Sequence, residues 1–514
     1  MAVPNKEPAP RALISVSDKR GLQELASGLL ALGYELVSTG GTLAALRGWG
    51  LPAVAVADVT GFPEILDGRV KTLHPKVHGG ILARREPGHL AELARHEIAP
   101  VDVVVANLYP FRETVARPDV TFAEAIEQID IGGPSMLRAA AKNHADVTVL
   151  VDPEDYAITL EALARGMTLA ERRELALKAF AHTAAYDAAI VAYLSRDEAL
   201  PRHLAVALER AEVLRYGENP HQMGARYREV GAASIWDAAK LHSGLALSYL
   251  NLFDAEAAWR LAHDLAAHAP ACVIVKHANP CGAAWGEDLG AAYERAFDAD
   301  PKSAFGGVVA LAGVVDLALA ELIVARPKAD VVLAHGYAPE ALELLARKRK
   351  NTRIIELPAP HAASYGLRRL DGGFLLQGPD AVTLDRARWR VVTSKEPTGE
   401  QWRDAVMAQL VCAATSSNAV VLVAGGCAVG IGAGQQSRVD AAEIAVRKAA
   451  GRAAGGVCAS DAFFPFRDGL DAVAASGIGL VVQPGGSIAD DAIIAAAEEH
   501  FMSMVFTGER HFRH

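Results

Sequence analysis

The N-terminal part of the chain alternates short apolar runs with amphipathic stretches, and this alternation restricts the fold more than any other feature. Residues 13–16, 34–37, 101–106 and 147–151 are short and apolar, as expected for buried strands. Between the first two, apolar side chains recur over residues 22–29 with the spacing of one helix face. Strands that alternate with helices usually form a parallel sheet covered by helices. The sequence therefore predicts an N-terminal α/β domain.

The same alternation returns in the C-terminal part. Residues 157–210 are predicted to be mostly helical, and we place a domain boundary near residue 200. Beyond it, apolar strands are predicted at residues 271–275, 307–311, 419–423, 428–431 and 479–482. Gly425-Gly426 lies between two of these strands and is typical of a hairpin turn. Since the protein has 514 residues, we predict one domain over residues 1–199 and a region over 200–514 with two α/β lobes.

Charge and cysteine content narrow the class of protein. The chain has 51 Lys and Arg against 61 Asp and Glu, so its net charge of -10 argues against nucleic-acid binding, which needs a basic surface. The five cysteines include no C-x-x-C pair, which favours reduced thiols. The N-terminal residues contain no apolar signal segment, and no apolar stretch is long enough to cross a bilayer. We expect a cytoplasmic protein that binds small molecules and neither nucleic acids nor membranes.

A phosphate-binding site is predicted after the second strand. Residues 38–42, Ser-Thr-Gly-Gly-Thr, form a tight loop before a helix that is expected to begin at Leu43. Small residues at a helix N-terminus let backbone N–H groups approach an anion closely. Lys19, Arg69 and Lys71 can add positive charge near the same edge of the sheet. An ordinary glycine turn with solvated cations is the structural alternative for these residues.

Three further segments add acid–base groups to this N-terminal site. Tyr109 follows a predicted strand, Asp130 precedes Gly132-Gly133, and Lys142 ends an alanine-rich stretch. A phenol, a carboxyl group and an ammonium group can together move protons during a reaction. Each alone would be an ordinary surface residue, so it is their combination that indicates a site.

A second site is predicted where Lys276 and His277 follow the strand at residues 271–275. Side chains at the carboxyl end of such a strand point into the crevice where α/β proteins bind ligands. Imidazole can accept a proton, and an ammonium group can stabilise a developing negative charge. A buried structural histidine beside a solvated lysine is the alternative. Further polar or glycine-rich segments suit a site of this kind, namely residues 215–222, 300–307, 416–418, 430–438 and 460–468.

No metal or dinucleotide site is predicted. His74 and His78 have the spacing of two ligands on one helix face, but a proline lies between them and no glutamate completes an H-E-x-x-H motif. Cys281 has no second cysteine at the spacing of a zinc site. The segment 430–435 fails as a G-x-G-x-x-G fingerprint, because Gln435 stands in place of the third glycine.

Long segments of the chain resemble the family of bifunctional purine biosynthesis enzymes with AICAR transformylase and IMP cyclohydrolase activity. The most specific of these segments are RVKTLHPKVHGGILAR, EQIDIGGPSMLRAAAKNHADVTV, LRYGENPHQ, KHANPCG, GIGAGQQSR and SDAFFPFRD. The resemblance runs from LISVSDK near the N-terminus to the terminal RHFRH. So many long segments in the same order would rarely match by chance.

The resemblance implies a fold and two reactions. The N-terminal domain would be a methylglyoxal-synthase-like parallel sheet with cyclohydrolase activity. The C-terminal region would be a formyltransferase built from two cytidine-deaminase-like lobes without zinc. The enzyme would transfer a formyl group from 10-formyltetrahydrofolate, its cosubstrate, to AICAR, and would then close formyl-AICAR to IMP with loss of water. The resemblance also implies a homodimer, with the transformylase sites at the subunit interface, and no catalytic metal.

The resemblance also assigns residues to the cyclohydrolase site. Lys142 matches the catalytic position, and Lys71, Tyr109 and Asp130 match residues that assist it. The matched nucleotide contacts are Ser17, Asp18, Lys19, Ser38, Thr39, Gly40, Gly41, Arg69, Val70, Thr72, Asn107, Leu108 and Ile131.

In the transformylase region, His277 matches the proton acceptor and Lys276 matches the group that stabilises negative charge. His277 also matches an AICAR contact, and the other AICAR contacts match Arg215, Tyr216, Gly306, Asp330, Asn418, Arg438, Phe463 and Arg510. The folate contacts match Val439, Asp468, Ser487 and Ile488. One departure from the family is that residues 439–458 form a shorter stretch than in its longer members.

Two other functions fit parts of the pattern. A zinc-dependent nucleoside deaminase would share the lobe fold, but it needs an H-x-E and P-C-x-x-C set that the sequence lacks. A nucleotide-binding regulator would keep the phosphate loop without catalysing a reaction. The Lys276-His277 pair argues against the regulator, and measured turnover would exclude it.

Overall fold

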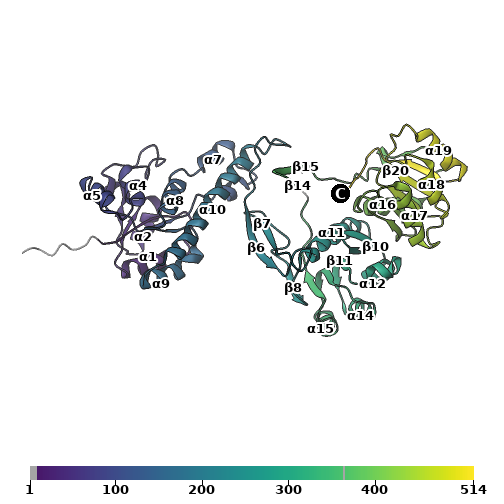
Figure 1. Cartoon of the computed structure of the whole chain (residues 1–514), viewed down its shortest axis with the longest axis horizontal. Helices are drawn as coiled ribbons and strands as arrows, with labels where there is room; N and C mark the ends of the chain where they lie inside the picture. Colours follow the sequence, from purple (N-terminus) through teal and green to yellow (C-terminus); the bar gives the residue numbers. More distant parts are fainter. Residues whose placement is uncertain (1–8, 363–364) are drawn as a thin grey trace, which may run out of the picture. The chain divides into compact units, whose positions relative to one another are not determined.

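The protein is described by a computed structural model that covers residues 9–362 and 365–514. It forms two compact units: unit 1 is Met1–Leu208 with Glu229–Gly231, and unit 2 is Glu209–Arg228 with Ala232–His514. In Figure 1, unit 1 runs from purple to blue and unit 2 from teal to yellow. Each unit has its own sheets and its own hydrophobic core.

Unit 1 contains a five-stranded parallel sheet in the order β3-β2-β1-β4-β5. Its strands are β1 (Arg11–Ser15), β2 (Glu35–Ser38), β3 (Val54–Ala55), β4 (Val103–Ala106) and β5 (Thr148–Leu150). Successive side chains of β1 enter opposite cores: Leu13 packs in one cluster, whereas Ala12 and Ile14 pack in the other. Because both faces are buried, the strands are apolar throughout. The predicted parallel sheet is confirmed.

Helices cover both faces of this sheet (Figure 1). The helices of unit 1 are α1 (Leu22–Ala31), α2 (Gly40–Gly48), α3 (Val56–Thr60), α4 (Pro75–Leu82), α5 (Pro87–Arg95), α6 (Phe111–Val115), α7 (Phe122–Glu127), α8 (Gly132–Lys142), α9 (Tyr156–Arg165) and α10 (Leu169–Leu194), with the short 3₁₀ turn η1 (Pro153–Asp155). Helix α1 buries Leu22 and Leu29 against one face, and α8 buries Met136 and Leu137 against the other.

Two helix boundaries predicted for this part of the sequence are wrong. Helix α2 begins at Gly40 instead of Leu43, so the loop glycines form its first turn, where backbone N–H groups have no partner within the helix. The helical stretch predicted to reach residue 210 ends at Leu194. Tyr193 is the last buried residue of α10, and Pro201 cannot continue a helix. A strand, β6 (Leu208–Leu214), occupies the end of the predicted helical stretch.

Unit 2 contains two six-stranded sheets with the same topology. Their orders are β10-β9-β11-β12-β13-β8 in the first lobe and β18-β17-β19-β20-β21-β16 in the second. In both lobes a hairpin at the edge pairs antiparallel to its neighbour, the next two pairings are parallel, and the last is antiparallel. The region therefore holds two α/β lobes that repeat one arrangement.

All five strands predicted in this region are present, and others were missed. The strands are β8 (Lys240–Ser243), β9 (Ala271–Lys276), β10 (Asn279–Trp285), β11 (Val308–Val315), β12 (Val331–Tyr337) and β13 (Arg353–Glu356) in the first lobe, and β16 (Arg390–Val391), β17 (Val420–Val423), β18 (Ala428–Gly432), β19 (Val457–Ser460), β20 (Leu480–Gln483) and β21 (Ser503–Phe506) in the second. Two further hairpins pair β6 with β7 (Gly224–Glu229) and β14 (Gly366–Leu370) with β15 (Gly373–Gln377). The Gly425-Gly426 hairpin turn is confirmed, since both glycines have positive φ between β17 and β18.

The helices of the two lobes also correspond. Helix α11 (Tyr249–Ala266) precedes the β9–β10 hairpin as α16 (Gly399–Ala413) precedes the β17–β18 hairpin. The strands that follow are connected by α12 (Leu289–Ala299), α14 (Leu317–Ala325) and α15 (Pro339–Lys348) in the first lobe and by α17 (Arg438–Ala449), α18 (Arg467–Ala474) and α19 (Asp490–Glu499) in the second. The short α13 (Pro301–Ala304) and η2 (Arg386–Arg388) complete the unit.

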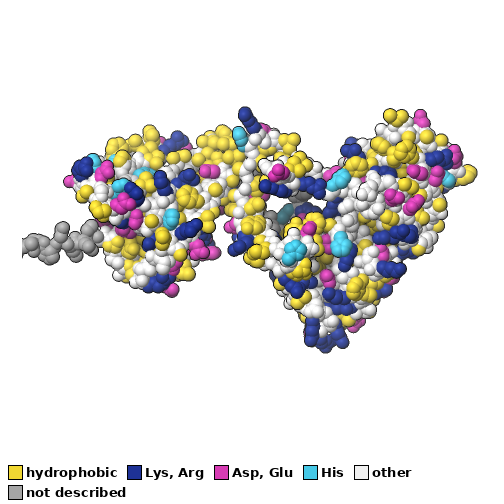
Figure 2. Space-filling view, in the orientation of Figure 1, with side chains coloured by type: hydrophobic (Ala, Val, Ile, Leu, Met, Phe, Trp, Pro, Cys, Tyr) yellow, Lys and Arg dark blue, Asp and Glu magenta, His cyan; other side chains and the backbone are white. Residues whose placement is uncertain are grey.

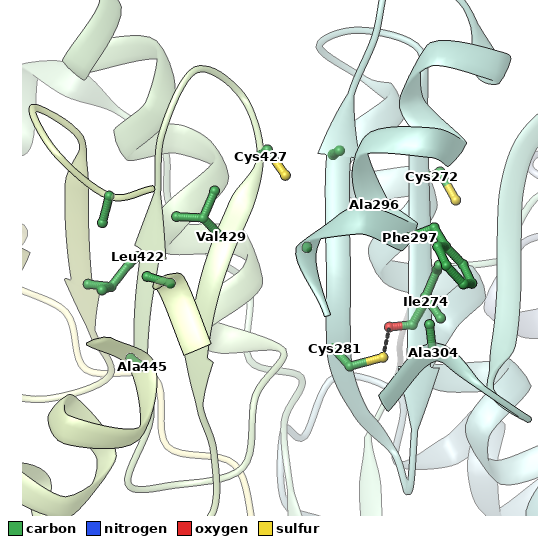
Figure 3. Packing of buried hydrophobic residues seen from close by; sticks show 14 of the residues in the cluster. Cys272, Ile274, Cys281, Ala296, Phe297, Ala304, Leu422, Cys427, Val429 and Ala445 are labelled. Carbon is green, nitrogen blue, oxygen red and sulfur yellow. Dashed lines mark hydrogen bonds between the residues drawn. The ribbon is translucent and has the colours of Figure 1, made fainter. Parts of the chain in front are cut away.

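The two lobes share one continuous hydrophobic cluster. It includes Ile274 of β9 and Leu422 of β17, and Figure 3 shows these residues on the two neighbouring sheets. The edge strands β10 and β18 are linked by a β-bridge between Ala284 and Cys427. Because the lobes pack edge to edge, the turn of the first hairpin lies next to residues of the second lobe.

Candidate active sites

In unit 1, Asn107 joins the loops that follow two neighbouring strands. Its Oδ1 accepts hydrogen bonds from the backbone N–H groups of Ser17 (2.6 Å) and Asp18 (2.9 Å), and its Nδ2 donates to the Asp18 carbonyl (3.1 Å). Asn107 is buried at the end of β4, beside β1. The sheet thus brings together three residues from segments that lie far apart in the sequence, at the edge where α/β proteins bind ligands.

The predicted glycine loop and Lys71 also lie together. The Lys71 Nζ is so close to Gly40 that a Cβ built on this glycine would lie 3.4 Å from it. Thr39 Oγ1 donates to Glu64 Oε1 (2.6 Å), and Lys71 Nζ lies 3.7 Å from Glu64 Oε2. A carboxylate that the sequence did not indicate therefore lies beside Thr39, the N-cap residue of α2.

Two predicted contacts are engaged elsewhere. The Ser38 hydroxyl is buried and donates to the Ile14 carbonyl (2.7 Å), so it supports the sheet. The Arg69 guanidinium forms an exposed ion pair with Glu127. The Arg69 side chain must leave this pair before it can bind an anion in the site.

Asp130 lies at the N-terminus of α8 in a partly buried position. Its Oδ1 accepts a hydrogen bond from the Gly133 N–H (2.9 Å), and its own N–H donates to the Tyr186 hydroxyl (2.8 Å). Burial raises the pKa of Asp130, while backbone N–H groups, among them that of Tyr109, and the charge of Lys71 act in the opposite direction. A carboxyl group with a raised pKa is suited to accept and return a proton near neutral pH.

The neighbours of Asp130 include other predicted contacts. A Cβ built on Gly132 would lie 2.7 Å from Thr72 Oγ1, and one built on Gly133 would lie 2.7 Å from Leu108 Cδ2. The segment with Val70, Lys71 and Thr72 and the segment with Leu108 therefore both approach the start of α8, next to Ile131. Ile131 and Tyr109 are exposed here.

Lys142 lies apart from this cluster. It ends α8, whereas Asp130 precedes the first turn of the same helix, and a helix of this length spans about 15 Å. Lys142 instead lines a cavity of about 710 Å³ together with His78, Arg138, His144, Arg173 and Phe180. Within a single copy of the protein, the structure does not bring Lys142 together with Lys71 and Asp130.

In unit 2, Lys276 and His277 lie where β9 turns into β10. The Lys276 Nζ donates to the carbonyls of Phe305 (3.2 Å) and Gly306 (3.1 Å). A Cβ built on Gly306 would lie 3.2 Å from this ammonium group and 4.0 Å from Asp330 Oδ1. Asp330 forms an ion pair with Lys328 (2.8 Å). Three predicted residues thus converge beside the exposed His277.

Residues of the second lobe reach the same hairpin. Asn279 Oδ1, which follows the turn, accepts a hydrogen bond from the Ser416 N–H (2.8 Å). Nearby, Arg438 donates to Asn418 Oδ1 (2.8 Å) and to Ser460 Oγ (2.7 Å), and it forms a buried ion pair with Asp461. The predicted Asn418 and Arg438 are therefore in direct contact.

The C-terminal residues of the protein approach this cluster. The His511 N–H donates to the carbonyl of Asp461 (3.1 Å), the ion-pair partner of Arg438. Arg510 directly precedes His511, the residue that makes this contact. The Arg510 guanidinium lies over the Phe512 ring, 4.4 Å from its centroid. Phe463 is half-buried.

Arg353 is a buried cation that the sequence did not indicate. It begins β13, its Nη2 donates to the Ala246 carbonyl (3.0 Å), and its Nε has no hydrogen-bond partner among the described residues. Burial lowers its pKa, and Asp330, Tyr216 and Arg215 lie close enough to perturb it. The guanidinium of Arg215 lies 5.4 Å from the centroid of the Tyr216 ring. Arg353 occurs in a charged run without a turn signal, so no local pattern could have revealed it.

The predicted folate contacts lie at helix N-termini of the second lobe. A Cβ built on Gly469 would lie 3.8 Å from the Cα of Val439, so the starts of α17 and α18 meet beside Asp468. Ser487 and Ile488 lie in the loop between β20 and α19, where Ser487 Oγ accepts from the Ala489 N–H (3.0 Å). Ile488 is fully exposed, and Phe466 is 70% exposed.

Metal-binding groups and membrane-spanning helices are absent from the described part of the protein. Within residues 9–362 and 365–514, no group of three or more His, Cys, Asp and Glu side chains is placed to hold a metal ion. Within the same ranges, none of the helices is both long and apolar enough to span a membrane.

The fold and these clusters are those of an α/β enzyme whose two units each carry polar groups at the ends of their strands. Two family models match the sequence: "AICARFT/IMPCHase bienzyme" matches residues 140–448, and "MGS-like domain" matches residues 21–135. Because the first spans more than half of the sequence, the chain belongs to the AICARFT/IMPCHase bienzyme family. A solved structure titled "Crystal structure of ForH" is 40% identical, covers 37% of this chain and 98% of that chain, and superimposes with a TM-score of 0.35.

Family membership confirms the predicted class of enzyme. The protein transfers a formyl group to AICAR and closes the product to IMP in purine biosynthesis. It also confirms the methylglyoxal-synthase-like fold of the N-terminal part, whose parallel sheet is described above.

Proposed function

We propose that the two reactions are divided between two domains, cyclisation over residues 1–199 and formyl transfer over residues 200–514. The observation that carries this proposal is the presence of two separate clusters of polar groups, one in each unit. Lys71 and Asp130 belong to the first cluster, and Lys276 and His277 belong to the second. Their neighbours differ in kind: the first cluster surrounds a helix N-terminus, and the second surrounds a hairpin turn.

Formyl transfer is proposed to use His277 as base and Lys276 as electrostatic catalyst. The amine nitrogen of AICAR attacks the formyl carbon and its proton passes to the His277 imidazole. The bond from the formyl carbon to the donor nitrogen then breaks, and the departing nitrogen takes up the proton from His277, which regenerates the base. The ammonium group of Lys276 stabilises the negative charge that develops on the formyl oxygen. Its two bonds to backbone carbonyls already fix its position. Arg215, Tyr216, Asn418, Arg438, Phe463 and Arg510 bind AICAR in this proposal, with Gly306 and Asp330 at the first-lobe wall.

The proposed formyl donor is 10-formyltetrahydrofolate, which supplies an activated formyl group when bound. Val439, Asp468, Ser487 and Ile488 would hold it. The exposed apolar side chains of Ile488 and Phe466 suit a flat aromatic group, and the Asp468 carboxylate suits the N–H groups of such a ring. We infer no metal in either step.

Cyclisation is proposed to use Lys71, Asp130 and Tyr109. The carboxamide nitrogen of formyl-AICAR attacks the formyl carbon, and water leaves after proton transfers. Lys71 polarises the formyl oxygen, while Asp130 and Tyr109 exchange protons with the reacting groups. Much of the rate comes from orientation, since the reaction is intramolecular.

The phosphate of the nucleotide is proposed to bind at the N-terminus of α2. Glu64 supports this, because its carboxylate is an anion held by Thr39 and close to Lys71. The same donors can hold a phosphate once Glu64 moves away. The remaining contacts are those the resemblance assigns, with Ser38 contributing through its backbone because its hydroxyl is bound to β1.

We also propose that the protein is a homodimer in the cytoplasm. Lys142 supports the dimer, since a part in cyclisation requires a second copy to bring it to the cluster at Asp130. The five free, buried cysteines favour a reducing compartment. Figure 2 shows Lys and Arg interspersed with Asp and Glu over the visible face of each unit, which favours small-molecule partners over nucleic acids.

A coupled assay with AICAR and 10-formyltetrahydrofolate tests the division of labour. Tetrahydrofolate and IMP are followed separately in the wild type and in variants of each cluster. We expect both products from the wild type. Tetrahydrofolate without IMP beyond spontaneous closure would leave only the second cluster assigned. A folded protein that forms neither product would contradict both assignments.

A further inference from the structure

The turn that carries His277 has an unfavourable backbone conformation. His277 and the following Ala278 have φ values of 52° and 57°, both in the left-handed region. A two-residue hairpin turn of this kind is usually built from Asn and Gly, because other side chains are strained there. Two consecutive residues of this type need an external restraint to stay in place.

Asp254 supplies that restraint from helix α11. Its Oδ2 accepts a hydrogen bond from the His277 N–H (3.2 Å), and its Oδ1 accepts from the Ala278 N–H (2.7 Å). The side chain is 9% exposed, so these bonds are made away from water. A carboxylate matches two N–H donors with two acceptor oxygens, whereas an amide would turn its own donor toward one of them.

The second lobe repeats the arrangement at a turn that has no base. Asp404 stands as far from the N-cap of α16, Thr398, as Asp254 stands from the N-cap of α11, Ser248. Its Oδ1 accepts a hydrogen bond from the Gly426 N–H (2.7 Å) in the Gly425-Gly426 turn. Both lobes thus use an Asp carboxylate from the same helix position to hold their hairpin turn.

The two lobes differ in the residues that the carboxylate holds. The glycines of the second lobe adopt φ values of 56° and 72° without steric strain. The first lobe has His277 and Ala278 at the same two positions, where the same conformation is strained. The restraint therefore matters more in the first lobe, where it also fixes the direction of a functional side chain.

We propose that Asp254 is a positioning residue for formyl transfer, whose carboxylate holds the left-handed turn that presents the His277 imidazole beside Lys276. This inference rests on the proposed role of His277 as base. The residues on either side of the turn are fixed independently, Lys276 by two carbonyls and Asn279 by Ser416. The turn itself is what Asp254 controls.

Asp254→Asn is the direct test, and Asp404→Asn is its matched control. Both replace a buried carboxylate that holds a hairpin turn, but only the first turn carries His277. Asp254→Asn should lower the kcat of formyl transfer roughly 10- to 100-fold while cyclisation is unchanged. Asp404→Asn should leave the kcat of transfer near the wild-type value. Equal losses of kcat in the two variants would overturn the proposal.

Ala278→Gly tests whether Asp254 acts through the turn, because a merely structural role of Asp254 would not let this change restore kcat. Glycine adopts the left-handed conformation without strain, so this change should restore several-fold of the lost kcat in the Asp254→Asn background. Failure of this rescue in a folded double variant would count against the proposal. If Asp254→Asn does not fold, Ala278→Val strains the same turn without touching α11. It should lower the kcat of transfer, and an unchanged kcat would overturn the proposal.

His277→Ala distinguishes an error about the base from an error about Asp254. If it retains formyl transfer, the proposed base is wrong, and Asp254 loses its role with it. If it abolishes transfer while Asp254→Asn retains full kcat, the base stands and the inference about Asp254 is overturned.

Discussion

At the residue scale, the two sites hold their key side chains in different ways. Lys276 is fixed by two backbone carbonyls, and the exposed His277 projects from a strained turn. Asp130 is partly buried, and its carboxylate is surrounded by backbone N–H donors. The first arrangement fixes an ammonium group next to an exposed imidazole, and the second keeps a partly buried carboxyl group whose pKa is raised.

Replacing His277 should separate the two activities. We expect His277→Ala to lower the kcat of formyl transfer about 10²- to 10⁴-fold, because the proposed general base is lost. Cyclisation of formyl-AICAR should be unchanged, since the residues proposed for it lie in unit 1. The coupled assay measures both, with His268→Ala as a control for loss of a histidine elsewhere in the first lobe. A parallel loss of both activities in folded protein would contradict the division.

Asp130→Asn should lower cyclisation activity and raise the stability of the folded protein. The variant should lose most cyclisation and keep transfer. Because the pKa of Asp130 is raised in the folded protein, its ionisation costs stability, and this cost grows as pH rises from the ordinary value for Asp through the raised one. Asparagine cannot ionise, so its Tm should exceed that of the wild type at pH 7. The difference should shrink as pH falls toward the ordinary value, which thermal unfolding at several pH values would reveal.

At the element scale, glycines let strands pack closely against helices in both lobes. A Cβ built on Gly282 of β10 would lie 2.0 Å from the Ala296 carbonyl oxygen of α12. One built on Gly432 of β18 would lie 1.9 Å from the Ala441 carbonyl oxygen of α17. The glycines of the GIGAGQQSR segment thus include two, Gly430 and Gly432, that serve helix–strand packing in the second lobe.

Gly282→Ala should destabilise unit 2. The added methyl group meets a helix backbone that cannot move aside, so we expect a loss of about 1–3 kcal/mol in the free energy of unfolding. Gly373→Ala is the matched control, because no described atom lies within 4 Å of a Cβ built there. Denaturant unfolding measures both. If the two variants are equally stable, the close approach of β10 and α12 is not as described.

At the scale of the whole molecule, each cluster of polar groups is assembled from more than one segment of the sequence, and the proposed role of Lys142 requires a second copy. The first lobe supplies Lys276 and His277, and the second supplies Asn418 and Arg438 within the same unit. Lys142 ends α8 and lines a cavity that does not include Lys71 or Asp130. A homodimer reconciles its assignment with its position.

Mixing two inactive variants tests this reconciliation. Lys142→Ala and Asp130→Asn should each lose cyclisation and retain formyl transfer. If Lys142 acts across the dimer, subunit exchange between them should restore about a quarter of wild-type cyclisation, because half of the dimers then carry one intact site. Lys142→Ala mixed with itself is the control. A mixture that stays inactive while subunits exchange would place Lys142 outside the site of the second copy.

Local patterns were sufficient for much of the fold and for the loops of both sites. Apolar runs located four of the five strands of the first sheet and missed the two-residue β3, and the apolar strand predicted at residues 271–275 drew attention to the Lys276-His277 pair after it. The prediction of a helix beyond Leu194 is wrong. The residues after Leu194 are compatible with a helix, but they have no core to pack against, and packing supplies most of the stability of a helix. Helix α2 starts three residues before its predicted start. The prediction failed because glycine has a low helix propensity, which hides the fact that Gly40 can form a first turn.

The sequence by itself determined the family and the two reactions, and its motifs indicated the residues proposed to carry them. Only the tertiary structure decided which groups meet. Glu64 beside Thr39, Arg353 beside Asp330, and Asp254 under the His277 turn are contacts between distant segments that no local pattern encodes. The separation of Lys142 from Asp130 is likewise a property of helix length and direction. These contacts depend on the tertiary structure because a buried polar group needs a hydrogen-bond partner, and that partner can come from any segment that the fold brings near.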